Sequence, residues 1–293
     1  MISEVEIYSE PGNEFKDIKV EKLATGFQFA EGPVWHPDNY LLFSDVIASQ
    51  IIQLCPDGKH SVYLADSGGP ATHQQLVSKM AGSGGLAIKD TNIIFCRGAS
   101  HSIACMNREM EVNVIIDSYQ DKPLNSPNDL ILKTDGSFYF SDPPYGLKDE
   151  ILHTDTFQDK AGVYYYSEGK LKRVFEELNY PNGVCLSTDE QFLYISSNHP
   201  QEPYLYKCLL SVTGEITEKT ILREQNADGI ATDLDGNLFL STNEGVLIIS
   251  SEGEKLALLP LPEPAVNITW GGSNLTELYI TAVTSIYRAK NFI

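Results

Sequence analysis

Six short segments of the sequence share a pattern in which one residue precedes a small or turn-forming residue and an apolar run. We call the residues at this shared position the column: they are Glu31, Gly84, Asn128, Asn182, Asp228 and Val266. Four of them carry a carboxylate or amide oxygen. Ca²⁺ takes such oxygens as ligands, with water completing a coordination number of about six to eight, whereas Zn²⁺ favours His or Cys. The column therefore predicts a calcium site if the fold brings these four side chains together.

The spacing of the column predicts the fold. Its members follow one another at intervals of about 38 to 54 residues, which suits a four-stranded propeller blade with variable loops. Each is followed by short apolar strands around a turn, such as 130–132 and 138–140, and no long stretch has helical periodicity. We predict an all-β fold, a six-bladed β-propeller of four-stranded blades, with residues 1–293 forming a single domain.

The two ends of the chain predict how the ring closes. After Val266 the chain is long enough for about three strands, one fewer than a blade needs. An extended segment, 18–23, precedes the first column member. We predict that this N-terminal segment forms the outer strand of the last blade.

A propeller would also bring the column together. The first strand of each blade lines the central channel, so the four oxygen-bearing side chains should face one point. Two carboxylates that meet in a partly desolvated channel repel each other, and a bound cation removes that cost. Two other interpretations stay open. The Asn-Gly and Asp-Gly pairs could be ordinary turns, or the cation could be a structural plug without catalysis.

Strand direction indicates which loops surround the same mouth of the channel. The second strand of each blade returns to that mouth, so the loops that follow it should lie beside the cation. These loops contain five candidates for substrate contact or proton transfer: His101, Asp142, Tyr145, His153 and His199.

Composition narrows the class of protein. The formal net charge of −19 argues against binding to nucleic acid or to anionic membranes. The N-terminus lacks the pattern of a signal peptide, and no apolar run approaches the roughly 20 residues of a membrane span. Five cysteines without Cys-x-x-Cys spacing indicate reduced thiols. Patterns for a serine-hydrolase elbow, a phosphate loop or a zinc protease are absent. We expect a cytoplasmic enzyme that is a monomer or a weak homo-oligomer.

Several motifs together resemble one known family, that of gluconolactonase, senescence marker protein and luciferin-regenerating enzyme. The resemblance covers roughly residues 24 to 290. The motifs are Glu31-Gly32-Pro33-Val34-Trp35, Ser126-Pro127-Asn128-Asp129, Phe140-Ser141-Asp142-Pro143-Pro144-Tyr145-Gly146, Tyr180-Pro181-Asn182-Gly183, Asp228-Gly229 and the closing segments 270–275 and 278–282.

The resemblance implies a six-bladed propeller with one divalent cation, usually Ca²⁺, in its channel. It implies ligands at Glu31, Asn182 and Asp228, and it makes Asn128 a ligand to metal or substrate. It also makes Asp228 the usual general base. Two positions depart from the family pattern: Gly84 stands where relatives often have Asn, and Ser126 stands where sugar-lactone members can have Arg. Both departures concern the substrate and not the metal.

We therefore predict a metal-dependent hydrolase that opens a lactone ring. The cation, most consistently Ca²⁺ with Mg²⁺, Mn²⁺ or Zn²⁺ as substitutes, would polarise the ester carbonyl while Asp228 deprotonates water. The partner is a small-molecule lactone. Two alternatives remain: a phosphotriesterase of the diisopropyl-fluorophosphatase type, whose metal-binding set is similar, and a non-catalytic calcium-binding propeller.

Overall fold

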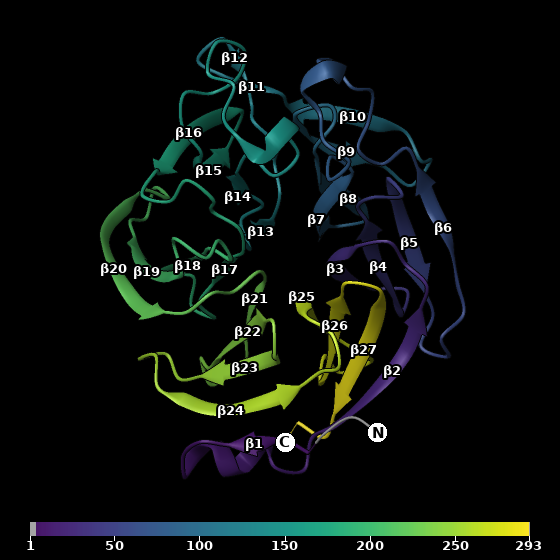
Figure 1. The fold of residues 1–293 in the computed structure, drawn as a ribbon, viewed down its shortest axis with the longest axis vertical. Coiled ribbons are helices and arrows are strands. Elements are labelled where there is room, and N and C mark those ends of the chain that lie inside the picture. The colour runs from purple at the N-terminus through teal and green to yellow at the C-terminus, as the bar shows by residue number, and fades with distance from the viewer. Residues whose placement is uncertain (1–3, 293) are drawn as a thin grey trace.

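The computed structural model describes residues 4–292. Six antiparallel sheets are arranged in a ring, and the first strand of each lies nearest the central axis (Figure 1). The prediction of a six-bladed propeller of four-stranded blades is therefore confirmed. Within residues 4–292, three short 3₁₀ helices lie outside the sheets: η1 (Pro11–Phe15), η2 (Gln74–Leu76) and η3 (Lys148–Glu150).

The blades follow the chain in order, and each runs from the channel outwards. Blade 1 is β3 (Ala30–His36), β4 (Tyr40–Asp45), β5 (Gln50–Leu54) and β6 (His60–Ala65). Blade 2 is β7 (Ser83–Lys89), β8 (Asn92–Arg97), β9 (Ser102–Met106) and β10 (Val112–Ile116). Blade 3 is β13 (Leu130–Leu132), β14 (Phe138–Asp142), β15 (Gly162–Ser167) and β16 (Lys170–Phe175). A small ribbon of β11 (Ser118–Tyr119) and β12 (Lys122–Pro123) lies between blades 2 and 3 in the sequence.

Blade 4 is β17 (Val184–Leu186), β18 (Phe192–Ser196), β19 (Tyr204–Leu210) and β20 (Ile216–Glu224). Blade 5 is β21 (Ile230–Thr232), β22 (Leu238–Thr242), β23 (Gly245–Ile249) and β24 (Lys255–Pro260), and β1 (Glu6–Ile7) adds to its outer edge. Blade 6 is β25 (Ala265–Gly271), β26 (Glu277–Ala282), β27 (Ser285–Lys290) and β2 (Lys19–Thr25).

The ring closes in blade 6, where strands from both ends of the chain pair. Strand β2 pairs antiparallel with β27, from Lys19 opposite Lys290 to Thr25 opposite Ser285. Figure 1 shows this N-terminal strand, in purple, along the outer side of the C-terminal strands in yellow. The predicted closure by the N-terminal segment is confirmed; the strand begins one residue later and ends two residues later than the predicted segment 18–23.

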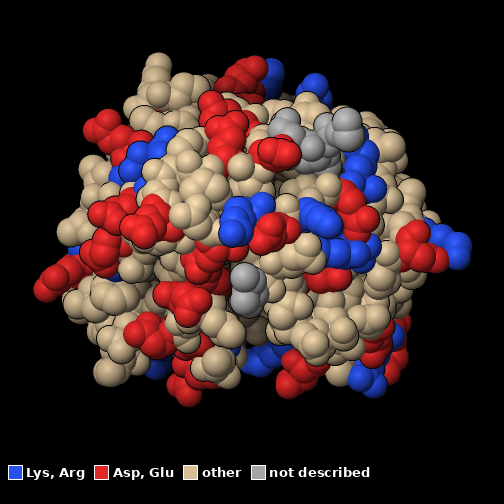
Figure 2. Space-filling model, turned by 90° about the horizontal axis from the view of Figure 1, so that it is seen from below, with Lys and Arg blue, Asp and Glu red and all other residues tan. Residues whose placement is uncertain are grey.

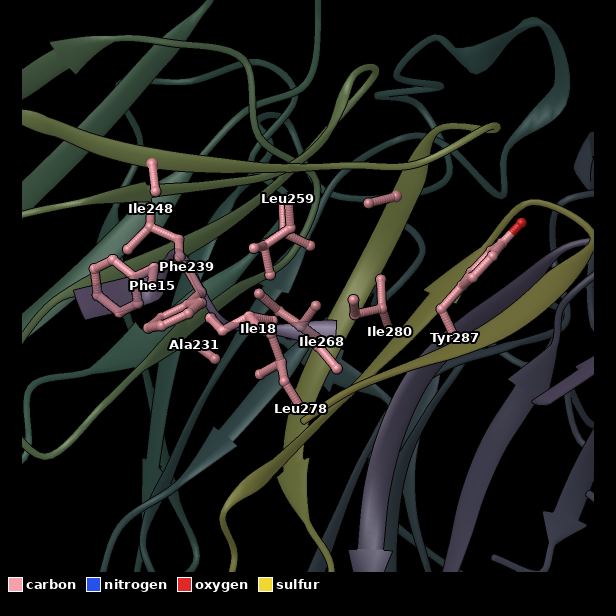
Figure 3. Packing of buried hydrophobic residues seen from close by; sticks show 14 of the residues in the cluster. Phe15, Ile18, Ala231, Phe239, Ile248, Leu259, Ile268, Leu278, Ile280 and Tyr287 are labelled. Atoms are coloured by element: carbon pink, nitrogen blue, oxygen red, sulfur yellow. The ribbon is translucent and has the colours of Figure 1, made fainter. Parts of the chain in front are cut away.

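Separate apolar clusters fill the spaces between neighbouring blades. Between blades 5 and 6, Phe239 of β22 and Ile268 of β25 pack with Phe15 of η1, and all three are buried (Figure 3). Alternating side chains of each sheet face these spaces, as expected for strands with two covered faces. This packing fixes every blade against its neighbours and so holds the inner strands in place around the channel.

The surface is acidic but mixed in sign. On the side of the ring seen from below, Asp and Glu side chains are widely spread, with smaller groups of Lys and Arg among them (Figure 2). Across residues 4–292, none of the helices has the length and apolar character needed to cross a membrane.

Candidate functional site

The four oxygen-bearing column residues occupy matching places at the start of the inner strands. Glu31 is the second residue of β3, and the other three each come two residues before β13, β17 or β21. In blades 3 to 5 the match extends to hydrogen bonding. The backbone N–H of each column residue donates to the carbonyl of a serine on the second strand, at 2.8–3.0 Å. One repeated backbone geometry therefore sets the position of all three side chains.

Glycines beside the column allow the inner strands to approach closely. A Cβ on Gly183 would lie 2.3 Å from the carbonyl oxygen of Asp228, and one on Gly84 would lie 2.1 Å from that of Asn128. Gly183 does not have a positive φ. The Asn-Gly pair in blade 4 is thus required by strand packing and is not a turn, which removes the simplest alternative interpretation of that motif.

The structure brings the four column side chains to one cavity of about 110 Å³. Glu31, Asn128, Asn182 and Asp228 all line it, together with Tyr145 from the loop after β14. Blade 2 itself contributes only small residues, Gly82, Ser83, Gly84 and Gly98, and Met80 from the preceding loop lies beside them.

Two amide oxygens in this cavity have no protein partner. The Oδ1 atoms of Asn128 and Asn182 are buried without a hydrogen bond to any of residues 4–292. Leaving a buried polar atom unpaired costs about 1–3 kcal/mol, so two in one small cavity indicate that something else satisfies them. A hard cation held by two amide and two carboxylate oxygens fits this donor set. Because half of these ligands are amides, the site differs from a cluster of three or more His, Cys, Asp or Glu residues, and the described chain contains no such cluster.

The two carboxyl groups of the cavity both have raised pKa values. Burial raises the pKa of Glu31 well above its usual value, and the charges of Asp228 and Asp129 raise it further. Burial also raises the pKa of Asp228, to about 7, and the charge of Asp129 contributes to this rise. Hydrogen bonds from Asn198 and Asn182 lower the pKa of Asp228 but do not outweigh the burial. Positive charge in the cavity would stabilise the ionised form of both column acids.

Sequence reasoning missed two polar residues beneath these acids. Asn267 of β25 donates its Nδ2 hydrogen to Oε1 of Glu31 at 2.7 Å, which leaves Oε2 free of this bond. Asp129 accepts the backbone N–H of Val184 at 3.1 Å, and burial raises its pKa to about 6. Both adjoin column positions, being next to Val266 and Asn128, and this adjacency was the available signal.

Asn198, in the cavity wall, is a third residue that sequence reasoning missed. The Tyr145 hydroxyl donates to Oδ1 of Asn198 at 2.6 Å, and Nδ2 of Asn198 donates to Oδ2 of Asp228 at 2.9 Å. In the sequence, Asn198 precedes His199, whose imidazole is the more familiar catalytic group. Tyr145 was among the loop candidates, and it is the one that lines the central cavity.

The other four loop candidates lie elsewhere than in the cavity wall. Asp142 is fully buried, and its carboxylate accepts the backbone N–H groups of Asn125 and Ser126 at 2.9 and 2.8 Å. It thereby holds the loop that leads to Asn128. His101 is 1% exposed, with Nδ1 bound to the carbonyl of Asn125 at 2.5 Å.

His153 and His199 are partly exposed. Nε2 of His153 lies 3.1 Å from the carbonyl of Lys148, and the ring of His199 stacks on Tyr180 with centroids 4.0 Å apart. Neither imidazole lines the cavity. Substrate contact by these loop residues stays a prediction.

The sequence of this chain is similar to those of known proteins. A family model described as "SMP-30/Gluconolactonase/LRE-like region" matches residues 29–284. A gluconolactonase from Zymomonas mobilis is 32% identical over 288 residues, an alignment that covers 92% of this chain and 81% of that protein.

Solved structures show the same fold. A gluconolactonase from Xanthomonas campestris superposes with a TM-score of 0.86 at 24% sequence identity, covering 98% of this chain and 94% of that one. Regucalcin from Agrobacterium tumefaciens, a calcium-binding protein, superposes with a TM-score of 0.73 at 15% identity, covering 98% of this chain and 93% of that one.

Proposed function

The chain belongs to the SMP-30/gluconolactonase/LRE-like family, and from this premise we propose that it is a metal-dependent hydrolase that opens a lactone ring. The observation that carries the proposal is the convergence of two carboxylates and two unpaired amide oxygens in one cavity. The relative from Zymomonas mobilis is a gluconolactonase, which supports the same type of reaction.

A divalent cation, most consistently Ca²⁺, would be held by Glu31, Asn128, Asn182 and Asp228. When bound, it would supply a Lewis acid for the ester carbonyl and for the charge that develops on its oxygen. The neutral amides supply ligand oxygens without further charge, so the site carries two negative charges for one divalent ion. The regucalcin relative is a calcium-binding protein, which supports the choice of ion.

Asp228 is the proposed general base. Its carboxylate would take a proton from the water that attacks the lactone carbonyl, and it would return a proton to the ring oxygen as the ester bond breaks. The bound cation would keep this carboxylate ionised, which is the form that can accept a proton. Asn128 and Asn182 would orient the reacting ester beside this carboxylate.

The cavity favours a small, uncharged substrate. Its volume is about 110 Å³, below the roughly 300–1,000 Å³ of pockets for drug-sized ligands. Among the described residues, no Lys or Arg lines it, whereas Glu150 does. The two proposed carboxylate ligands offset the charge of the cation, so an anionic lactone would meet repulsion from Glu150 and no basic side chain to offset it. We propose a neutral lactone with a single small ring.

The test is hydrolysis of a lactone panel by the purified protein, with and without chelator. The panel pairs neutral sugar lactones with aliphatic lactones and with a lactone that carries a carboxylate. We expect turnover of neutral members, loss with chelator and recovery with Ca²⁺. The variant Asp228→Asn keeps the shape of the side chain but removes the base, and we expect its kcat to fall by about 10²–10⁴.

Calcium binding without turnover of any lactone would overturn the proposed reaction. Phosphotriesters would then be tested with the same protein, since a cation that stabilises a lactone oxyanion can also stabilise a phosphoryl one. Turnover that is unchanged by chelator would overturn the role of the metal.

A further inference from the structure

The geometry points to Tyr145 and Asn198 as positioning residues that fix the carboxylate of Asp228 for its role in the cavity. This inference rests on the proposed function, because it assigns a task to residues that surround the proposed base. It assigns a positioning role to two side chains of the cavity wall, neither of which belongs to the column.

Three blades contribute to the contact. Tyr145 comes from the loop after β14 in blade 3, Asn198 from the loop after β18 in blade 4, and Asp228 from the start of blade 5. The hydroxyl of Tyr145 lies 2.6 Å from Oδ1 of Asn198, and Nδ2 of Asn198 lies 2.9 Å from Oδ2 of Asp228. We call these three side chains the relay.

The relay has a direction set by chemistry. An ionised carboxylate only accepts hydrogen bonds, so the side of the Asn198 amide that faces Asp228 must be the NH₂ group. The opposite oxygen then accepts from the Tyr145 hydroxyl. If the amide turned over, its oxygen would face the carboxylate of Asp228 and repel it. Tyr145 therefore opposes that flip and keeps the donor on Asp228.

Both supports of Asp228 are themselves anchored. The main-chain carbonyl of Asn198 accepts a hydrogen bond from Nδ2 of Asn226 at 2.9 Å. The carbonyl of Tyr145 accepts one from the hydroxyl of Ser78 at 3.1 Å. The first bond fixes Asn198 against the segment that carries Asp228, and the second holds Tyr145 from a separate loop before blade 2. Both side chains are thereby kept in place beside the carboxylate.

The two carboxylate oxygens of Asp228 therefore have different roles. Oδ2 accepts the hydrogen bond from Asn198, and we assign Oδ1 to the cation and the attacking water. Groups that orient a metal ligand in this way typically change metal affinity or activity by about 10–100-fold when they are removed. Tyr145 has no bond of its own to Asp228 and acts through Asn198.

The experiment is a double-mutant cycle with Asn198→Leu, Tyr145→Phe and the double variant. Each protein is measured for Ca²⁺ affinity by calorimetry and for kcat and KM on the neutral lactone turned over fastest. We expect Asn198→Leu to lose about tenfold or more in Ca²⁺ affinity and in kcat, and Tyr145→Phe to lose less. The double variant should equal Asn198→Leu, because Tyr145 acts through Asn198. Asn198→Ala replaces Asn198→Leu if the larger side chain prevents folding.

Tyr166→Phe is the matched control, since it makes the same chemical change on β15, away from the cavity. We expect its Ca²⁺ affinity, kcat and KM to equal those of the wild type. The inference is overturned if the effects of Tyr145→Phe and Asn198→Leu multiply in the double variant, or if Asn198→Leu leaves both Ca²⁺ affinity and kcat unchanged. A wild type that binds Ca²⁺ but hydrolyses no lactone overturns the proposed reaction alone, because the calorimetric cycle still decides on the relay. A wild type that binds no Ca²⁺ overturns both.

Discussion

Glu263 fastens the closing blade, and its removal should weaken the ring measurably. Its carboxylate accepts hydrogen bonds from the backbone N–H and the hydroxyl of Thr284 at 2.8 and 2.9 Å, and from the hydroxyl of Tyr287 at 2.7 Å. Lys22 of the closing strand β2 lies 3.5 Å away. Glu263 therefore connects the loop before β25 with both β27 and β2.

The magnitude follows from the pKa of this carboxyl. Burial would raise the pKa of Glu263, but the hydrogen bonds from Ser285, Thr284 and Tyr287 outweigh it and hold the value at about 2, against 4.5 for a free Glu. At about 1.4 kcal/mol for each tenfold change, this difference corresponds to about 3 kcal/mol. Since the side chain keeps 16% of its exposure and solvent screens part of the interaction, we expect Glu263→Gln to lower the free energy of unfolding by about 2 kcal/mol at pH 7.

The effect has a defined dependence on pH. A carboxyl whose pKa is lower in the folded protein stabilises it above pH 4.5, and this contribution is lost as the pH falls towards 2. The difference between wild type and Glu263→Gln should therefore shrink to less than half by about pH 3. Urea unfolding at pH 7, 4 and 3 measures it, with chelator present so that cation binding does not add to stability.

Glu21→Gln is the control for charge removal in the same blade. Glu21 pairs with Arg288 and Lys290 at the surface, with half of its side chain exposed, so its loss should cost at most about 1 kcal/mol and depend on salt. The reasoning is refuted if Glu263→Gln unfolds within 0.5 kcal/mol of the wild type at pH 7, where about 2 kcal/mol is expected. It is also refuted if the difference does not shrink in acid.

Two further predictions concern the cavity. Burial raises the pKa of Glu31, and it raises that of Asp228 to about 7, so Ca²⁺ must displace protons at low pH. The Ca²⁺ affinity should therefore fall about tenfold from pH 8 to pH 6. Calorimetry in buffers of different ionisation enthalpy measures the proton release, and finding none would contradict this prediction. Gly183→Ala places a Cβ 2.3 Å from the carbonyl of Asp228 and should cost about 1–3 kcal/mol in urea unfolding and weaken Ca²⁺ binding. Gly236→Ala, with a φ of +84° and open space around the new Cβ, should reduce stability through backbone strain and leave Ca²⁺ affinity unchanged.

The sequence was most informative where one physical rule repeats. In blades 3 to 5 the chain enters the inner strand with the same backbone geometry, and the recurrence of one residue position was enough to predict both the blades and the convergence of the column. The closure by β2 was predictable for a related reason. A blade without its outer strand exposes an unpaired edge, and the extended N-terminal segment was available to cover it.

Loop side chains were harder to place, because sequence order gives the mouth of the channel on which a loop lies but not the direction of its side chains. Asp142 illustrates this: it ends β14 at the correct mouth, yet its carboxylate turns to two backbone N–H groups. Asp45 does the same at the end of β4, accepting the N–H groups of Gln28 and Phe29 at 3.0 Å. The tripeptide Phe-Ser-Asp occurs at both places in the sequence, and this repetition indicates a structural role for the two acids.

Asn198 could not have been found in this way. Its contribution depends on a side-chain conformation fixed by Tyr145 and Asp228, which lie 53 positions before it and 30 after it in the chain. No periodic pattern relates residues of three different loops. Asp129 was visible in its motif, but its effect on the channel acids depends on burial that composition does not reveal.

Gly84 supplies no ligand atom because the inner strands pack closely at this position, and the same close packing shapes the cavity. A side chain there would overlap the backbone at Asn128, and one at Gly82 would lie 2.0 Å from the carbonyl of Val46. Close packing of the inner strands thus requires small residues on the blade 2 side, while blades 1, 3, 4 and 5 supply the oxygens. The asymmetry of the column therefore follows from strand packing: blade 2 supplies backbone contacts to its neighbours, and the ligand oxygens come from the other side chains around the cavity.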